Sequence, residues 1–131
     1  MNLRDKLQRA NKEVTSISAD EAASLHDAAK VLFVDVREIH ELEREGTISG
    51  AVHASRGFLE FAVDPQSAAH NEQLIPDADI VVFCASGMRS LLAARTMMEM
   101  GFNRVRNLEG GFTAWRNRGG PITPVAPSAK P

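Results

Sequence analysis

Val31-Leu-Phe-Val-Asp-Val36 is the stretch of sequence that decides the fold, and Ile80-Val-Val-Phe83 repeats its pattern further along the chain. Both segments are short, almost wholly apolar and rich in β-branched residues, which is typical of strands buried on both faces of a sheet. Because strands that alternate with helices imply right-handed crossovers, the sequence predicts an α/β fold with a mostly parallel central sheet and helices on both faces. Further short strands are expected at residues 14–17, 51–54 and 105–108, and helices at residues 1–12, 19–29, 38–44 and 90–100.

Local signals mark the bounds of several elements. Ser18 precedes Glu21 by three residues, which is the spacing of a capping box at a helix N-terminus. Residues 46–50 predict a turn. Residues 110–115 predict a turn into a short helix that packs Trp115 on the core.

Length and composition fit one globular domain. The chain has 131 residues, of which 44% are hydrophobic and 24% charged, so it is large enough to bury a core of its own without disulfides. Residues 1–12 predict an N-terminal helical extension and residues 13–120 the domain itself. Gly and Pro are frequent from Gly119 onward and no apolar period remains there, so residues 121–131 are expected to form a flexible tail.

Charge and hydropathy argue against several classes of partner. Fifteen basic and seventeen acidic side chains give a formal net charge of −2, which argues against a nucleic acid partner. No run of 18 apolar residues is present and the first residues lack the apolar core of a signal peptide, so we expect no membrane partner and a cytoplasmic location. The four histidines lack the spacing of a metal site, so we expect no metal and no cofactor.

Cys84 is the single cysteine, and it directly follows a predicted strand. This places it at the carboxyl ends of the strands, where ligands bind in open parallel sheets. The segment from Val82 to Leu91 runs from this strand through a loop of small residues into a helix. Such a loop can turn several backbone N–H groups toward one point, and the helix N-terminus and Arg89 would add positive potential. Because these influences lower a cysteine pKa from about 8.5 to roughly 3.5–7.5, Cys84 is predicted to be a nucleophile.

A free cysteine is also commonly a small buried hydrophobic residue, and position alone does not separate the two interpretations for Cys84. The residues that follow it favour the reactive one. A buried structural cysteine gives no reason for a glycine at 87, an arginine at 89 and a helix-capping serine at 90. An arginine in the first turn of a helix is unfavourable unless an anion lies beside it.

Asp35 and Arg37 form a second candidate constellation at the end of the first buried strand, with Glu41 a turn further on. The carboxyl ends of neighbouring parallel strands lie at one edge of the sheet. Asp35 and Arg37 are therefore expected to brace the Cys84 loop by hydrogen bonding to its backbone. A structural ion pair among Asp35, Arg37 and Glu41 is at least equally consistent with the sequence, and both interpretations can hold together.

Four motifs together resemble the rhodanese (thiosulfate sulfurtransferase) domain family. The resemblance covers roughly residues 13–120, and four motifs in register make chance agreement improbable. In chain order they are Asp35-Val36-Arg37-Glu38 with Glu41, Gly46-x-Ile48-x-Gly50-Ala51, Cys84-Ala85-Ser86-Gly87-Met88-Arg89-Ser90, and Leu108-Glu-Gly110-Gly111-Phe-x-Ala114-Trp115.

This resemblance implies a single rhodanese-like domain that acts as a sulfurtransferase without a cofactor. Cys84 would take the outer sulfur of a donor such as thiosulfate as a persulfide and pass it to a thiol, cyanide or protein acceptor. Arg89 would help bind the anionic part of the donor, while Asp35, Arg37 and Ser90 would support the loop. The backbone N–H groups that would cradle the outer sulfur are those of Ala85, Ser86, Gly87, Met88 and Arg89.

Two departures from the family pattern bear on the donor. Many members carry histidine and proline where this chain has Thr47 and Ser49, so no role of that histidine is transferred. Members that use thiosulfate often carry basic residues directly after the cysteine, whereas Ala85 and Ser86 are neutral. The identity of the donor therefore stays open.

Two other functions use the same scaffold. Phosphatases and arsenate reductases of this fold have a cysteine-to-arginine loop that encloses five residues, whereas Cys84 and Arg89 enclose four. A smaller ring of N–H groups suits a sulfur atom better than a tetrahedral phosphate. A non-catalytic binding module of the rhodanese type usually lacks the nucleophile, which Cys84 supplies here.

Overall fold

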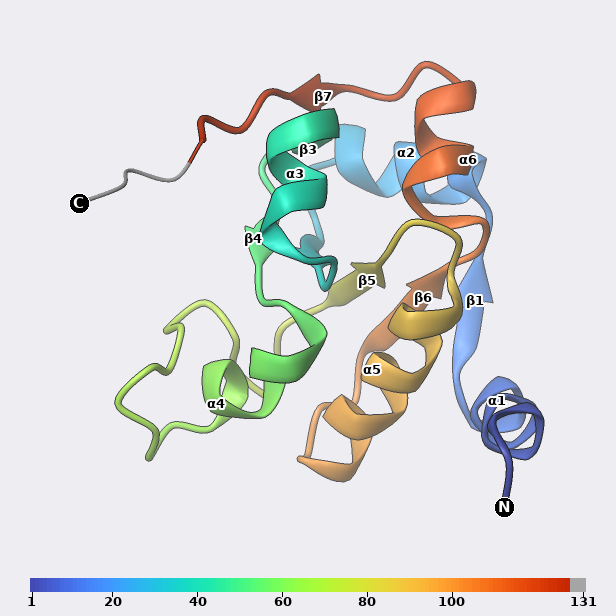
Figure 1. Ribbon diagram of the computed structural model, residues 1–131, viewed down its shortest axis with the longest axis vertical. Coiled ribbons are helices and arrows are strands. Elements are labelled where there is room, and N and C mark those ends of the chain that lie inside the picture. Colours follow the sequence, from blue (N-terminus) through green and yellow to red (C-terminus); the bar gives the residue numbers. More distant parts are fainter. Residues whose placement is uncertain (128–131) are drawn as a thin grey trace.

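A central sheet of five parallel strands confirms the predicted fold class (Figure 1). The computed structural model describes residues 1–127. The strand order is β1-β6-β5-β2-β4, so the two strongly apolar segments of the sequence lie side by side in the middle. The strands are β1 (Thr15–Ile17), β2 (Leu32–Asp35), β4 (Val52–His53), β5 (Ile80–Phe83) and β6 (Val105–Leu108).

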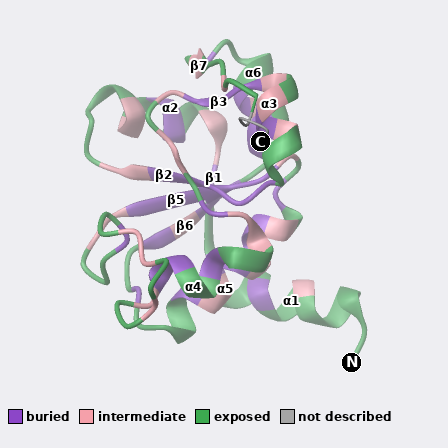
Figure 2. Cartoon of the chain, turned by 60° about the vertical axis from the view of Figure 1, so that its left-hand side comes forward, coloured by how far each residue is buried: buried purple, intermediate pink, exposed green. Residues whose placement is uncertain are grey.

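The strands β2 and β5 are buried on both faces, as their composition predicts. Successive side chains of a strand point to opposite faces, so Val82 packs into one core and its neighbours Val81 and Phe83 into the other. Figure 2 shows the result as a buried sheet between helices whose outer surfaces are exposed. The two central strands therefore require a run of apolar residues rather than an alternation of apolar and polar residues.

Helices cover both faces of the sheet (Figure 1). Ala10, Leu59 and Met97 bring three helices to one core, and Ala22 and Trp115 bring two to the other. None of the helices within residues 1–127 is long and apolar enough to cross a membrane. The helices are α1 (Leu3–Glu13), α4 (Leu59–Val63) and α5 (Met88–Glu99) on the first face, α2 (Ala19–Asp27) and α6 (Gly111–Asn117) on the second, with α3 (Ile39–Glu45) after β2 and a 3₁₀ turn η1 (Arg56–Phe58) before α4.

The start of α2 agrees with the prediction from the sequence, whereas the start of α5 differs from it. The predicted capping box is present in α2, where the Ser18 hydroxyl accepts a hydrogen bond from the Glu21 amide at 3.1 Å. Helix α5 begins at Met88, and its N-cap is Gly87 with φ +105°. The prediction that Ser90 caps this helix is therefore wrong, because Ser90 lies inside the first turn with its side chain turned to Cys84.

The turn at residues 46–50 and the start of the tail differ from the prediction. Strand β3 (Thr47–Ile48) pairs antiparallel with β7 (Ile122–Thr123), so residues 122–123 are not part of a flexible tail. Ile122 packs on the second core, and the Trp115 indole donates to the Pro121 carbonyl at 2.9 Å. Strands of only two residues are too short to show a hydrophobic period, so the sequence does not reveal β3 and β7. The last part of the predicted tail, residues 128–131, lies outside the described residues.

Candidate active site

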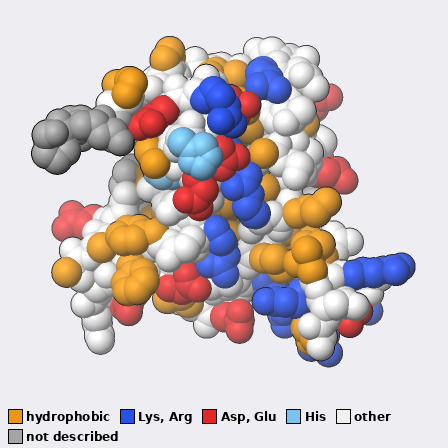
Figure 3. Space-filling model, in the orientation of Figure 1, with side chains coloured by type: hydrophobic (Ala, Val, Ile, Leu, Met, Phe, Trp, Pro, Cys, Tyr) orange, Lys and Arg blue, Asp and Glu red, His pale blue; other side chains and the backbone are white. Residues whose placement is uncertain are grey.

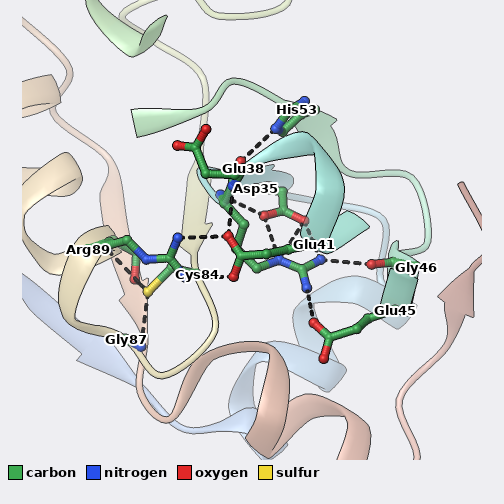
Figure 4. Close-up of polar contacts among 11 residues, drawn as sticks. Asp35, Glu38, Glu41, Glu45, Gly46, His53, Cys84, Gly87 and Arg89 are labelled. Atoms are coloured by element: carbon green, nitrogen blue, oxygen red, sulfur yellow. Dashed lines mark hydrogen bonds and ion pairs between the residues drawn. The ribbon is translucent and has the colours of Figure 1, made fainter. Parts of the chain in front are cut away.

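The segment from Cys84 to Ser90 runs from the end of β5 through a short loop into the first turn of α5, at the carboxyl end of the sheet. It turns hydrogen-bond donors toward the cysteine sulfur (Figure 4). The Gly87 amide nitrogen lies 3.1 Å from Cys84 Sγ, and the Ser90 amide nitrogen lies 3.4 Å from it. The Ser90 hydroxyl oxygen is 3.3 Å from the same sulfur. Because the first N–H groups of a helix have no partner within it, α5 supplies a donor as well as a favourable dipole.

These donors change the acidity of the Cys84 thiol. Burial opposes ionisation and by itself raises the pKa, because a thiolate loses hydration in an apolar surrounding. Once a thiolate forms, hydrogen bonds to it from the Ser90 hydroxyl, whose proton must then turn toward the sulfur, and from the amides of Ser90, Gly87 and Ser86 act in the opposite direction and outweigh burial. The pKa of Cys84 is consequently lower than that of a free thiol, as expected for a nucleophilic cysteine.

The N-terminus of α6 holds the loop in this conformation. The Phe112 amide donates to the Cys84 carbonyl at 2.8 Å, and the Thr113 amide donates to the Ala85 carbonyl at 3.2 Å. Both carbonyls are thereby tied to α6. This support was not identified from the sequence, although Gly110-Gly111 is the signal that could have indicated it.

Gly111 is required by this close approach. It has φ +58°, and a Cβ atom at this position would lie 2.5 Å from the Cys84 carbonyl oxygen and 2.7 Å from the Ala85 carbonyl carbon. No larger side chain fits without moving the loop, and the backbone conformation itself favours glycine. The glycine pair of the fourth motif thus belongs to the site.

The sulfur itself is almost fully covered, since Cys84 is only 1% exposed. Ser86 and Met88 in the same loop are exposed, and the Arg89 side chain is 41% exposed. Met88 and Arg89 are the first two residues of α5, so their amides have no partner within the helix. The start of α5 thus offers N–H groups that have no partner inside the helix.

Arg89 is not a free cation. Its Nη1 and Nη2 atoms donate to the two carboxylate oxygens of Glu41 at 2.8 and 2.9 Å, a bidentate ion pair between α5 and α3. The hydrogen bonds from Arg89 lower the pKa of Glu41 to about 2 against the opposing effect of burial, and the pKa of Arg89 is raised in turn. The anion expected beside an arginine in the first turn of a helix is thus Glu41.

A comparison with known protein families identifies the family to which this chain belongs. The rhodanese-like domain profile matches residues 18–118, which is most of the chain. The protein belongs to the rhodanese-like domain family. A sulfurtransferase from Allochromatium vinosum is 35% identical over 103 residues, which cover 79% of this chain and 86% of that relative.

Solved structures agree on the fold. A human single-domain sulfurtransferase is 26% identical with a TM-score of 0.72, covering 82% of this chain and 99% of the human chain. A protein of unknown function from Rhodopseudomonas palustris, described as a possible tyrosine phosphatase, is 41% identical with a TM-score of 0.89, covering 94% of this chain and 95% of that one. Two of these three proteins are named sulfurtransferases, and the third is described as a possible tyrosine phosphatase.

The Asp35–Arg37 pair of this rhodanese domain supports a different segment from the one predicted. Both side chains are fully buried, and Arg37 Nη2 lies 2.7 Å from Asp35 Oδ2. The same guanidinium donates to the Gly46 carbonyl at 2.8 Å and to Glu45 at 3.1 Å. Neither side chain has a hydrogen bond to the loop from 84 to 89 among the described contacts, so the expected bracing is wrong.

The structural ion pair that the sequence left open is present, but with Glu45 in place of Glu41. A seven-residue α3 places Glu41 toward α5 and Glu45 toward the end of β2. The Arg37 guanidinium carbon lies 4.2 Å from the ring centroid of Phe112 and 5.9 Å from that of Phe83, the residue before Cys84. Asp35 also accepts a hydrogen bond at 2.8 Å from Thr47, the residue at the family's histidine position.

Two histidines of the domain contact backbone carbonyl groups. His53 Nε2 lies 2.7 Å from the Arg37 carbonyl and His26 Nε2 lies 2.7 Å from the Ser49 carbonyl. Within residues 1–127 no three His, Cys, Asp or Glu side chains gather in a group that could hold a metal ion. Figure 3 shows acidic and basic side chains interleaved on the face where α3 lies, so neither sign of charge dominates there.

Proposed function

We propose that this rhodanese domain is a sulfurtransferase that carries a sulfane sulfur as a persulfide on Cys84. The observation that supports it most directly is the contact of Cys84 Sγ with the amides of Gly87 and Ser90 at the start of α5. These donors stabilise a thiolate at neutral pH. Relatives named sulfurtransferases at about a third sequence identity support the same general activity.

The reaction divides into two displacements. In the first, the Cys84 thiolate attacks the outer sulfur of the donor; a new S–S bond forms, the S–S bond of the donor breaks, and the leaving group departs with its electron pair. In the second, an acceptor thiolate or cyanide attacks the outer sulfur of the persulfide and releases the Cys84 thiolate. The free amides of Met88 and Arg89 stabilise the charge on the outer sulfur between the two steps.

The donor and the acceptor both come from outside the chain. Cys84 is the only cysteine, so no second thiol can resolve the persulfide internally. The acceptor is therefore a small thiol, cyanide or a partner protein. Arg89 binds the anionic end of the donor, and it must share its guanidinium with Glu41 to do so.

A phosphatase is the second candidate, because one structural relative at 41% identity is described as a possible tyrosine phosphatase. The loop argues for sulfur transfer. Only four residues separate Cys84 from Arg89. A tetrahedral phosphate group would need a larger ring of N–H donors than this loop supplies.

The decisive experiment measures the mass of the protein after incubation with thiosulfate, and compares it with the Cys84→Ser variant. We expect a gain of one sulfur atom that cyanide removes as thiocyanate, and no gain in the variant. An aryl phosphate assay runs beside it. Phosphate release without any sulfur on Cys84 would support the phosphatase, and neither activity, with a panel that includes 3-mercaptopyruvate and glutathione persulfide, would support a binding module.

A further inference from the structure

Asn107 of β6 belongs to the polar cluster behind Cys84, yet nothing in the reaction scheme above uses it. The residue is 4% exposed, and Ser90 beside it is fully buried. Asn107 Oδ1 lies 2.6 Å from Ser90 Oγ, which in turn lies 3.3 Å from Cys84 Sγ. A buried polar chain therefore runs from the nucleophile through one hydroxyl to one amide.

The orientation of the Asn107 amide follows from its other partners. Its Nδ2 atom donates to the Gly87 carbonyl at 3.2 Å and lies 3.3 Å from the Ser16 hydroxyl. A carbonyl oxygen can only accept, so the NH₂ end of the amide must face Gly87, and the reversed amide would set two acceptors against each other. Oδ1 is thereby held toward Ser90.

The single proton of the Ser90 hydroxyl then has one favourable place. Oδ1 cannot donate, so the short contact of 2.6 Å requires the proton of Ser90 to lie on the line to Asn107. With the proton there, Ser90 presents a lone pair to Cys84 Sγ, and this lone pair can accept a hydrogen bond from the thiol. To donate to a thiolate instead, the hydroxyl must turn away and leave Oδ1 buried without a donor.

We propose that Asn107 is a positioning residue that holds the Ser90 hydroxyl proton away from Cys84 and thereby favours the resting thiol over the free thiolate. The amides of Gly87 and Ser90 still donate to the sulfur. A persulfide, whose charge lies on the outer sulfur near the amides of Met88 and Arg89, does not need the Ser90 proton. This last step rests on the proposed function, whereas the effect on the free thiol does not.

The charged groups around Cys84 stay unchanged in a test of this proposal. They are Arg89 on α5 with its partner Glu41 on α3, and the buried Asp35–Arg37 pair at the end of β2. Within the described residues the hydrogen bonds of the Asn107 side chain reach Ser90, Gly87 and Ser16. Substitutions at 107 and 90 therefore report on the hydroxyl proton.

The test is the pH dependence of Cys84 alkylation by iodoacetamide in four proteins: the natural chain, Asn107→Leu, Ser90→Ala and the double variant. Asn107→Leu frees the Ser90 proton for the thiolate, so we expect the midpoint to fall by about one pH unit, a roughly tenfold change in the ionisation equilibrium. In the Ser90→Ala background the same substitution should change the midpoint by less than about 0.3 unit, because the hydroxyl that transmits the effect is gone.

Two further variants separate this effect from damage to the fold. Asn107→Asp keeps an acceptor for Ser90 and adds a negative charge, so it should raise the midpoint, opposite to Asn107→Leu. Ser16→Ala removes the second partner of Nδ2 but leaves Gly87 to orient the amide, so it should leave the midpoint unchanged. If Asn107→Leu does not fold, the Asp and Ser16 variants carry the test.

The proposal is wrong if Asn107→Leu leaves the midpoint unchanged or raises it, if its shift persists without the Ser90 hydroxyl, or if Asn107→Asp lowers the midpoint. Alkylation needs no sulfur donor. A failed shift in a protein that still forms thiocyanate would overturn the role of Asn107 alone, while a shift without sulfur transfer would overturn the proposed function alone.

Discussion

Arg89 and Glu41 face each other beside the loop that holds Cys84 (Figure 4). In the proposed reaction Arg89 is the cation that binds the anionic sulfur donor, and Glu41 already occupies it. At the residue scale we therefore expect the donor and Glu41 to compete for one guanidinium. The neutral residues Ala85 and Ser86 add no further cation.

The first prediction concerns this competition. Glu41→Gln keeps the shape of the side chain and removes its charge, so an anionic donor gains access to Arg89. We expect kcat/KM for thiosulfate to rise roughly two- to fivefold, the equivalent of up to about 1 kcal/mol for a partly exposed ion pair. An uncharged organic trisulfide serves as the control donor and should show no gain. A fall for both donors would mean that Glu41 only positions Arg89.

The second prediction concerns acid stability. The pKa of Glu41 is lowered from 4.5 to about 2, so the ion pair stabilises the folded state fully above pH 4.5, and this contribution is lost as the pH falls from about 4.5 to about 2. Because Arg89 is 41% exposed, solvent screening limits the contribution to about 1 kcal/mol or less. Urea unfolding at pH 6 and pH 3 should show a larger loss for the natural chain than for Glu41→Gln. Equal losses would contradict the prediction.

At the scale of elements, α6 acts on the active site through its first turn. Its amides bind the carbonyls of Cys84 and Ala85, which leaves the N–H groups of the loop free to face the sulfur. Trp115 at the other end of the helix is fully buried in the second core. The packing of α6 on the sheet therefore keeps the loop in the conformation on which the acidity of Cys84 depends.

The third prediction tests this link with two glycine variants. In Gly111→Ala the new Cβ would lie 2.5 Å from the Cys84 carbonyl oxygen, whereas Gly50 has φ +85° with nothing within 4 Å of a Cβ. Both variants bear the strain of a left-handed alanine, about 1 kcal/mol. Gly111→Ala should lose up to about 3 kcal/mol in urea unfolding and should alkylate more slowly at pH 7, because the loop must move.

Gly50→Ala is the matched control for this prediction, and its alkylation rate should equal that of the natural chain. If the two variants alkylate at the same rate, α6 does not set the conformation of the Cys84 loop.

At the scale of the whole molecule, Arg37 joins the two sheets. It lies two residues after β2 of the central sheet, donates to the carbonyl of Gly46 next to β3, and has the ring of Phe112 from α6 against it. Strand β3 in turn pairs with β7 near the end of the described chain. One buried cation thus connects segments from the first and last thirds of the sequence.

The fourth prediction follows from the burial of this pair. Arg37→Met leaves the Asp35 carboxylate buried without its cation and should cost about 3–5 kcal/mol in urea unfolding. The double variant Asp35→Asn with Arg37→Met should cost less than Arg37→Met alone, because no unpaired charge remains. Arg56→Met, which breaks the exposed pair with Glu60, is the control and should cost less than about 1 kcal/mol. A cost at Arg37 no larger than at Arg56 would refute the role of the buried pair.

The sequence by itself determined the parallel sheet, the order of its main helices and the place of Cys84 in the fold. The apolar segments that became β2 and β5 require burial on both faces, and a cysteine between such a strand and a helix lies at the carboxyl edge of the sheet. These conclusions depend on local composition and on the direction of the chain. Both are properties that a sequence displays directly.

Only the tertiary structure decided the partners of the polar side chains. Whether Glu41 or Glu45 meets Arg37 depends on how α3 is rotated against the sheet, and the pairing of β3 with β7 depends on where Trp115 packs. The contact of Asn107 with Ser90 joins residues 17 positions apart on two different elements. Hydrogen bonds and ion pairs act over a few ångströms, so they follow from distances that the sequence does not contain.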